Sequence, residues 1–479
     1  MFNKKQKKQL LEAGIPEAMI LQQIKDFERG FPFANIDRPA TLDDGIKSIS
    51  EEEANHLREL FKIIGSEQRI HRFVPASGAA TRMFKDLYAF LNDGTKSDTV
   101  DQFFERIDDF PFASFIPEEL KKDPKALAEF LLEGQLGYGN KPKALIPFHR
   151  YEEGPKEALA EHFFEASKIA GDIQKDLYLH FSVSPTQFSE FQQKAKTLAL
   201  AYGARFKENF ILEYTEQSPA TQTLAVNMDN TPVLDEEGKF ILRPGGHGAL
   251  IHNLAAIFSD IIFIKNIDNV CHESQSELSI FWKEVLGGKL IDIRQQVFEH
   301  MDNLLRAEGL EKALAFLKAE FGLELEENIP AALKALNRPI RVCGMVKNEG
   351  KAGGGPFWVK DQDGQLSLQI VEASQINTED STHRELLSKA THFNPVDIVC
   401  STKNHKGEKF RLHNFIDPYA GFISTKNFKG KDIKAMELPG LWNGAMANWL
   451  TIFAEVPFDT FNPVKSVNDL LEEKHQAAS

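Results

Sequence analysis

The chain has 479 residues, of which 42% are hydrophobic and 26% are charged. This composition is typical of a folded globular protein with more than one domain, and it excludes general disorder. The formal net charge of -14 repels polyanions. We therefore expect no nucleic-acid partner, and any phosphate site must be a local positive region.

Cysteine usage and hydropathy indicate the compartment. The three cysteines lie far apart without metal-ligand spacing, which suits a reducing environment. No apolar run approaches the ~20 residues of a membrane span, and the basic N-terminus is not followed by an apolar segment. We expect a cytoplasmic protein without a membrane partner, and the sequence leaves its oligomeric state open.

Helical and strand patterns follow one another in an order that divides the chain into parts. Residues 1–67 carry apolar side chains at helical spacing and are expected to form a helical N-terminal cap. Residues 68–276 are expected to form an α/β core with a helical insertion at 90–140. A second helical insertion is expected at 277–336. Residues 337–479 would complete the core and end in an amphipathic helix that starts at Val467.

The core shows strand patterns separated by helical ones. Residues 260–265 form a continuous apolar run, which is typical of a central strand covered on both faces. The alternation predicts an α/β fold with a mixed, mostly parallel sheet flanked by helices. The other expected strands include 69–75, 143–147, 176–183 and 206–214, and the expected helices include 81–91, 155–169 and 185–198.

The segment after the first of these strands has the composition of a phosphate-binding loop. Its small residues would let backbone N–H groups approach a phosphate closely. The following helix would direct its positive end toward the phosphate, and Arg82 would add a full charge. For the loop alone, a plain tight turn is an equally good interpretation. The loop consists of Ser77, Gly78, Ala79, Ala80 and Thr81.

A glycine-rich run lies at residues 243–250. Glycines before a helix let bare backbone lie against a flat ligand, and the helix start offers unpaired N–H groups. The alternative interpretation is a Pro-Gly turn followed by a helix. The run includes Gly245, Gly246, His247 and Gly248.

Asp268 follows the central strand at 260–265. Ligands of open α/β sheets bind outside the carboxyl ends of the strands, so a carboxylate there is placed to hold Mg²⁺ against a nucleotide. The alternative is an Asp-Asn turn that ends the strand.

These segments resemble the motifs of UDP-sugar pyrophosphorylases, in the same order along the chain. Residues 74–83 are similar to the glycine-rich signature with which that family binds the triphosphate, although Ser77 and Ala80 replace two glycines. If the last position needs a positive φ, Ala80 would cost roughly 1 kcal/mol or change the loop. Pro142 and Lys143 resemble the family's Pro-Lys pair, displaced by the helical insertion. The resemblance implies a GT-A-like nucleotidyltransferase fold in which Lys143 approaches the phosphates.

Two further segments of the core resemble elements of this family. Gln217 matches the glutamine of its Phe-x-Gln element, and residues 243–250 are similar to the element whose glycine backbone reads the edge of uracil. Asp268 and Asn269 resemble its Val-Asp-Asn motif. The resemblance implies that Asp268 binds Mg²⁺, that Asn269 neighbours the substrate and that residues 68–276 form the nucleotide-binding part.

The downstream part resembles the sugar-binding half of the same family. Lys347, a glycine turn ending at Gly355, and Glu372 are similar to its lysine strand, glycine turn and Val-Val-Glu-Tyr-Ser-Glu segment. The last segment keeps the first Glu and the Ser but lacks the Tyr and the second Glu, which leaves the sugar open. Lys465 matches the lysine of a Phe-x-Pro-Val-Lys element that contacts phosphate.

The resemblance implies an enzyme that forms an NDP-sugar, with a UDP-sugar favoured, and pyrophosphate from UTP and a sugar-1-phosphate, with Mg²⁺ as cofactor. A sugar-phosphate oxygen would attack the α-phosphorus in line, and the protein would supply positioning and charge. Arg82 and Lys143 would stabilise the pyrophosphate. Lys347 or Lys465 would hold the sugar phosphate, and Glu372 would accept hydrogen bonds from sugar hydroxyls.

Two alternatives stay open. The first is a catalytically inactive protein that binds a nucleotide or nucleotide-sugar and acts as a regulator, which the replaced glycines and the lost Tyr and Glu favour. The second is a glycosyltransferase of related fold, which would use an Asp-x-Asp metal motif. This spacing occurs in turn-like contexts such as residues 361–363.

Overall fold

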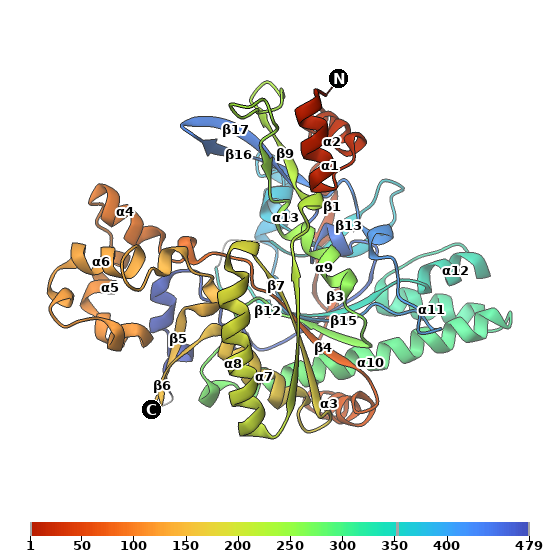
Figure 1. The fold of residues 1–479 in the computed structure, drawn as a ribbon. Helices are drawn as coiled ribbons and strands as arrows, with labels where there is room; N and C mark the ends of the chain where they lie inside the picture. Colours follow the sequence, from red (N-terminus) through yellow and green to blue (C-terminus); the bar gives the residue numbers. More distant parts are fainter. Residues whose placement is uncertain (1, 351–353, 478–479) are drawn as a thin grey trace.

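A nine-stranded sheet forms the centre of the molecule, with strand order β2-β3-β18-β12-β15-β11-β4-β7-β8 (Figure 1). The computed structural model describes residues 2–350 and 354–477. Only β15 among these nine strands runs antiparallel to its neighbours, so the expected mixed, mostly parallel sheet is confirmed. The strands are Thr41–Leu42 (β2), Gly45–Lys47 (β3), Leu450–Glu455 (β18), Ile340–Lys347 (β12), His392–Ser401 (β15), Ile261–Ile264 (β11), Ile70–Pro75 (β4), Asp176–Val183 (β7) and Asn209–Glu216 (β8).

Helices cover one face of this sheet. The long helix α10 (Glu277–Leu305) lies against β12 and β15, α3 (Glu51–Gly65) packs on α10, and α7 (Ala158–Ala170) and α8 (Phe188–Phe206) cover β7 and β8. The other face packs against α9 (Leu250–Ala256). All four residues of β11 are buried, because alternate side chains enter the two cores: Ile261 and Phe263 on one face, Ile262 and Ile264 on the other. The central position expected for this strand is therefore observed.

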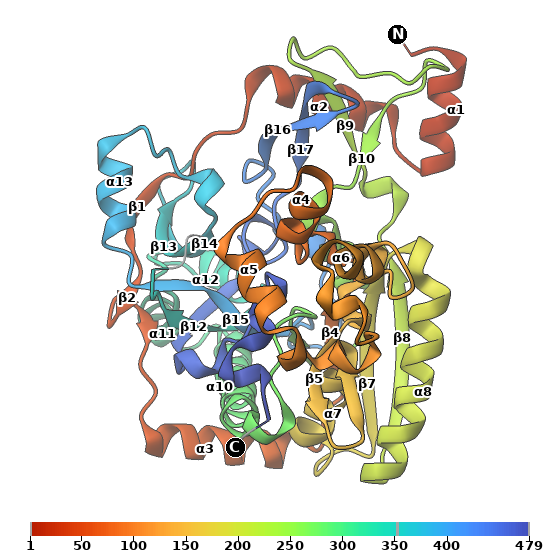
Figure 2. The same ribbon diagram turned by 90° about the vertical axis from the view of Figure 1, so that its left-hand side faces the viewer.

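Smaller units surround the sheet (Figure 2). Helices α4 (Lys85–Asp93), α5 (Asp98–Glu105) and α6 (Pro124–Leu132) enclose a phenylalanine-rich core of their own, while α11 (Leu310–Phe321) and α12 (Ile329–Leu336) follow α10. A four-stranded sheet contains β9 (Thr223–Asn227), β10 (Leu242–Arg243), β16 (Phe422–Phe428) and β17 (Lys431–Glu437). Helices α1 (Lys4–Ala13) and α2 (Glu17–Arg29) pack on it. The other elements are β1 (Ile36–Pro39), β13 (Gly355–Lys360), β14 (Leu366–Val371), α13 (Ser381–Ser388), β5 (Pro147–Tyr151) and β6 (Gly154–Glu157).

The N-terminal part is more than a helical cap. The expected helices are present, and Ser50 caps α3 by accepting a hydrogen bond from the backbone N–H of Glu53. Between α2 and α3, however, β1 pairs with β13, and β3 joins the central sheet beside β18. These strands are short, and their partners lie hundreds of residues away in the chain, so local sequence patterns give little sign of them.

Expected elements differ from the structure at three places. The helix expected at 81–91 begins only at Lys85, after a 3₁₀ turn at Ala80–Arg82. The strand expected at 143–147 is a 3₁₀ turn at Lys143–Leu145, and the helix expected from Val467 is a 3₁₀ turn at Val467–Leu471. In each case the first backbone N–H of the turn donates to a distant segment: Ala80 N–H to Lys141 O, Lys143 N–H to Gly78 O and Val467 N–H to Met83 O. No helix within the described ranges combines the length and apolarity needed to cross a bilayer.

Candidate active site

Asp268 lies at the centre of a cluster of charges beyond the carboxyl end of β11. Its side chain is 11% exposed, and its Oδ2 lies 2.9 Å from Nζ of Lys143 and 3.6 Å from Nζ of Lys465. Lys143 also donates a hydrogen bond of 2.6 Å to the carbonyl of Val464. Burial alone would raise the pKa of Asp268, but the two ammonium groups outweigh it and hold that pKa below its usual value. Asp268 is therefore a carboxylate at neutral pH.

The loop after β4 lies beside this cluster. Lys143 N–H donates to Gly78 O at 3.1 Å, and Ala80 N–H donates to Lys141 O at 3.0 Å, so the Pro142-Lys143 segment is fixed against the loop. Gly78 and Ala79 are exposed. These contacts bring the expected Pro-Lys pair to the expected loop despite the helical insertion between them.

The replaced glycines create no backbone strain in this loop. Ala80 is not among the described residues with positive φ, so the cost considered for a strained alanine does not arise. A Cβ added at Gly78 would meet no atom within 4 Å. Because α4 begins only at Lys85, the loop leads into a 3₁₀ turn and not directly into the N-terminus of an α-helix. Gly78, Ala79 and Arg82 are exposed beside the cluster, where a phosphate can contact them.

The glycine run lies between β10 and α9. A Cβ at Gly245 would come within 2.4 Å of Thr221 O, and one at Gly248 within 2.4 Å of Pro439 O. These two glycines are therefore required by close backbone packing. Gly246 has a φ of +73° and faces Glu437, whose Oε2 would lie 3.0 Å from an added Cβ.

His247 connects this run to the charge cluster. Its ring centroid lies 5.4 Å from that of Trp442. The surrounding protein lowers the pKa of His247, and the charges of Lys465 and Arg82 lower it further, whereas Glu437 and Asp268 oppose the shift. The charges of the cluster and of Arg82 therefore both act on His247.

The remaining predicted residues divide into those near the cluster and those apart from it. Asn269 is buried, where its Oδ1 accepts from Asn462 N–H at 2.8 Å and its Nδ2 donates to Val396 O at 3.2 Å. Its amide therefore fixes β15 and the C-terminal segment in place. Lys347, whose side chain is 67% exposed, lies 3.6 Å from Glu455. Gln217 lies directly after β8 and is partly exposed.

The predicted sugar-side residues lie around β13 and β14. A Cβ at Gly355 would come within 2.8 Å of His392 O, so this glycine allows β13 to approach β15. Burial and the nearby Glu437 raise the pKa of Glu372, and a hydrogen bond from Asn443 opposes that rise. The influence of Glu437 on both Glu372 and His247 links the sugar side to the charge cluster.

Sequence reasoning missed Glu437, Trp442 and Asn443. They belong to none of the motifs singled out in the sequence, and they reach this region at the end of β17 and in the segment that follows it. The Asp-x-Asp segment at residues 361–363, in contrast, lies outside the site: Asp361 Oδ1 accepts hydrogen bonds from the backbone N–H groups of Asp363 and Gln365. It caps the turn between β13 and β14, in agreement with its turn-like context.

A buried network of charges lies under the segment that joins β11 to Asp268. Glu165 on α7 forms ion pairs with Arg72 on β4 and, at 3.1 Å, with Lys265 at the end of β11. Lys283 on α10 lies 3.6 Å from both Glu165 and Asp397. All five side chains are buried, and they come from five different elements around the base of the loop that carries Asp268.

His162 extends this network to the Asp268 loop. Its Nδ1 accepts from Nε of Arg72 at 3.1 Å, so its Nε2 carries the proton and donates to Ile267 O at 3.1 Å. Burial lowers the pKa of His162, which keeps the ring neutral. The backbone one residue before Asp268 is therefore fixed through a chain of buried hydrogen bonds.

A second buried cluster holds the C-terminal segment that carries Lys465. His475 Nδ1 lies 2.9 Å from Nε2 of His149, whose Nδ1 lies 2.8 Å from Oε1 of Glu161. The Tyr151 hydroxyl donates to the same carboxyl oxygen at 2.8 Å. Burial raises the pKa of Glu161 to about 8, and it lowers the pKa of His149 and of His475.

This cluster predicts a pH dependence of stability. The folded chain keeps a proton on Glu161 up to about pH 8, whereas the unfolded chain releases it near pH 4.5, so stability falls as the pH rises through this window. His149 and His475 act oppositely: because the folded chain lowers their pKa values, they reduce stability below about pH 6.5, where the unfolded chain takes up protons. Between pH 6.5 and 8 we expect the free energy of unfolding to fall less steeply with pH in Glu161→Gln than in the wild-type chain. The difference in slope should be up to about 1.4 kcal/mol per pH unit. Urea unfolding at pH 6.5, 7.2 and 8 measures this, and parallel curves for both proteins would contradict it.

The sequence model of the family described as "Domain of unknown function (DUF4301)" matches residues 3–476. No curated protein matches the chain. Among solved structures, uridine diphosphate N-acetylglucosamine pyrophosphorylase from Trypanosoma brucei, in complex with an inhibitor, is 12% identical with a TM-score of 0.51, covering 94% of this chain and 74% of that chain. UDP-glucose pyrophosphorylase from Leishmania major, in complex with UDP-glucose, is 14% identical with a TM-score of 0.46, covering 97% and 77%. The first likeness shows that the chain has a pyrophosphorylase-type nucleotidyltransferase fold.

Proposed function

This chain belongs to the family described as "Domain of unknown function (DUF4301)", and we propose that it is a nucleotidyltransferase that forms an NDP-sugar and pyrophosphate, with UTP and a sugar-1-phosphate as the favoured substrates. One observation carries the proposal. A buried carboxylate beyond the end of a central strand, Asp268, contacts Lys143 and Lys465 beside the exposed loop that ends in Arg82. Substrate phosphates and a divalent cation need this combination of charges.

Asp268 suits a Mg²⁺ ion because it is deprotonated and lies just beyond a central strand, at the edge where α/β proteins bind nucleotides. Sites for Mg²⁺ that also involve phosphates commonly use one or two carboxylates from the protein. When bound, the ion would neutralise charge on the phosphate oxygens. The protein groups then have separate tasks: loop N–H groups and Arg82 bind the outer phosphates, and Lys143 holds the loop and the Asp268 carboxylate together.

Lys465 is a better candidate than Lys347 for binding the sugar phosphate. Lys465 is 66% exposed and still lies 3.6 Å from Asp268, so it can bind an incoming phosphate with little rearrangement. Lys347 lies at the end of β12 beside Glu455. In the proposal, Glu372 and Glu437 accept hydrogen bonds from the sugar hydroxyls, since Glu437 acts electrostatically on both Glu372 and His247.

Pyrophosphate release tests the proposal. The purified chain is incubated with Mg²⁺, UTP and a panel of sugar-1-phosphates, and pyrophosphate is measured by a coupled assay. We expect turnover with at least one sugar. Arg82→Ala should then lower kcat/KM at least about 100-fold, because it removes a full charge beside the leaving phosphates.

A matched control is Arg106→Ala, an exposed arginine in the helical insertion that pairs with Asp109; its activity should equal that of the wild-type chain. Wild-type rates in Arg82→Ala would contradict the role of the loop. The absence of pyrophosphate release with every sugar would contradict the enzyme.

A second candidate is a regulatory protein that binds a nucleotide or nucleotide-sugar without turnover. It is favoured by Asp268, whose Oδ2 already has two lysine partners. Binding of UTP or UDP-sugars in a calorimeter, together with no pyrophosphate release, would support this candidate over the enzyme.

A further inference from the structure

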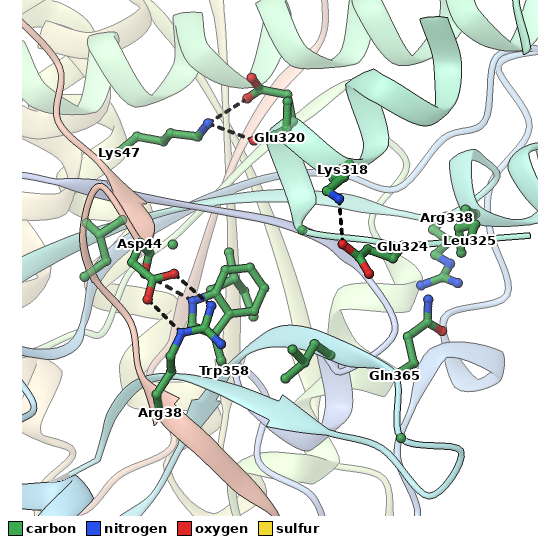
Figure 3. A pocket seen from close by; sticks show the side chains of 18 of the residues that line it. Arg38, Asp44, Lys47, Lys318, Glu320, Glu324, Leu325, Arg338, Trp358 and Gln365 are labelled. Carbon is green, nitrogen blue, oxygen red and sulfur yellow. Dashed lines mark hydrogen bonds and ion pairs between the residues drawn. The ribbon is translucent and has the colours of Figure 1, made fainter. Parts of the chain in front are cut away.

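A cavity of about 1100 Å³ lies beside β2 and β3, between α11 and α12 on one side and the β13–β14 turn on the other (Figure 3). A neighbouring cavity of about 740 Å³ shares part of its wall. Arg338, which belongs to both walls, lies two residues before β12. The carboxyl end of β12 is directed toward the edge of the sheet that carries the candidate active site. The first cavity therefore lies at the opposite edge, whereas the neighbouring cavity extends to Val371 and Gln375, beside Glu372.

Several cations of the wall already have partners. Arg38, Lys47 and Lys318 each pair with a carboxylate of the same wall, at N···O distances of 2.7, 3.5 and 2.7 Å. Figure 3 shows these pairs. Their charges are neutralised within the protein, so they are poor candidates for binding a ligand.

Arg338 and Lys334 differ from these cations. Neither side chain forms a hydrogen bond or ion pair that the structure records within residues 2–350 and 354–477. Burial lowers the pKa of Arg338, and Asp361 opposes the shift, but the Asp361 carboxylate already caps the β13–β14 turn. A partly buried guanidinium without a bonded carboxylate is stabilised when the anionic group of a ligand pairs with it.

The wall also contains the carboxylates of Asp43, Glu326 and Asp363, and other parts of it can contact the organic part of such a ligand. Figure 3 shows the Gln365 side chain pointing toward Arg338, which adds an amide donor and acceptor. Leu366 and the edges of the buried Leu368 and Trp358 supply apolar surface. The indole of Trp358 is held by its hydrogen bond of 3.1 Å to Asp44 O and by the Arg38 guanidinium, 4.9 Å from its ring centroid. A few polar groups on a largely preformed cavity of this size are typical of small-molecule sites.

We propose that this cavity binds a small phosphorylated metabolite, with its phosphate between Arg338 and Lys334 and its organic part along Trp358 and the leucines. Arginine and lysine together match the two negative charges of a phosphate monoester. The ligand is not a substrate of the proposed transferase, since the cavity lies at the other edge of the sheet. The site does not depend on the proposed function.

The probe is 4-methylumbelliferyl phosphate, a fluorescent aromatic phosphate monoester, and its anisotropy is measured on the full chain. We expect saturable binding and at least a tenfold higher Kd in Arg338→Met, because one charged hydrogen-bonding partner is lost. Lys334→Met should weaken binding severalfold, and competition with inorganic phosphate should displace the probe. Lys312→Met, on an exposed lysine of α11 outside the cavity wall, is the matched control and should bind as the wild-type chain does.

The proposed active site would also bind phosphate, so Arg82→Ala is measured alongside. The proposal requires that the part of probe binding that is lost in Arg338→Met is still observed in Arg82→Ala. It is overturned if the wild-type chain does not bind the probe, if both cavity variants bind it unchanged, or if Arg82→Ala alone abolishes binding. Lys334 is exposed, so Lys334→Met decides the outcome if Arg338→Met fails to fold.

Discussion

Replacing Asp268 by asparagine is expected to lower kcat/KM for pyrophosphate release by at least about 1000-fold. Asparagine has the same shape but lacks the charge that holds Lys143 and Lys465. In the proposed reaction it also loses the anionic ligand for Mg²⁺. The fold should persist, because the amide can still accept the hydrogen bond from Lys143. Activity is measured by coupled pyrophosphate release, and the fold by circular dichroism.

The Mg²⁺ dependence separates two roles of Asp268. If the carboxylate binds the metal, Asp268→Asn should shift half-saturation by Mg²⁺ to higher concentration. If it acts only by holding the lysines, half-saturation should stay the same while kcat falls. Asp93→Asn, at an exposed aspartate that ends α4, controls for the loss of one negative charge. Activity of Asp268→Asn within threefold of the wild-type chain would refute the assignment.

Replacing Glu165 by glutamine is expected to destabilise the chain by about 3–5 kcal/mol. Although burial favours its protonation, Lys265, Lys283 and Arg72 hold the pKa of Glu165 well below its usual value. The substitution leaves these three buried cations with Asp397 as the remaining carboxylate of the network. Removing one partner of a buried ion network is costly because the other charges remain without water.

The loss is measured as the shift of the first urea unfolding transition. Glu385→Gln removes an exposed carboxylate that pairs with Lys389 at 2.6 Å, and it should change stability by less than about 0.5 kcal/mol. Equal effects of the two substitutions would show that the buried network contributes no more than a surface pair.

The central part of the fold could be predicted because its signals are local. The strand expected at 176–183 coincides with β7 (Asp176–Val183), and the apolar run at 260–265 contains the buried central strand β11. The 3₁₀ turns at Ala80–Arg82 and Lys143–Leu145 could not be predicted in the same way. They exist because the two segments bond to each other across an insertion, and no helical or strand period records such a contact.

The candidate site shows the same division. The resemblance to a family pointed to Lys143, Asp268 and Lys465, and the structure brings these three together, although no measurement yet tests their roles. Glu437 was not predicted, since it carries no motif and becomes relevant only through its position beside Gly246. Glu165 lies in a helix that was expected, but its three cationic partners come from three other parts of the chain, so its burial among cations could not be predicted from sequence spacing.

The strand order of the central sheet implies an order of folding. Strands β4, β7, β8 and β11 lie within residues 70–264 and are neighbours in the sheet, so they can pair early. The β3–β18 pairing joins Ile46 to Phe453, about 400 residues apart, and contacts of such long range form slowly. Until β15 arrives from residues 392–401, the apolar edge of β11 stays open. This partly formed sheet is where intermolecular strand pairing, and with it aggregation, should begin when folding is perturbed.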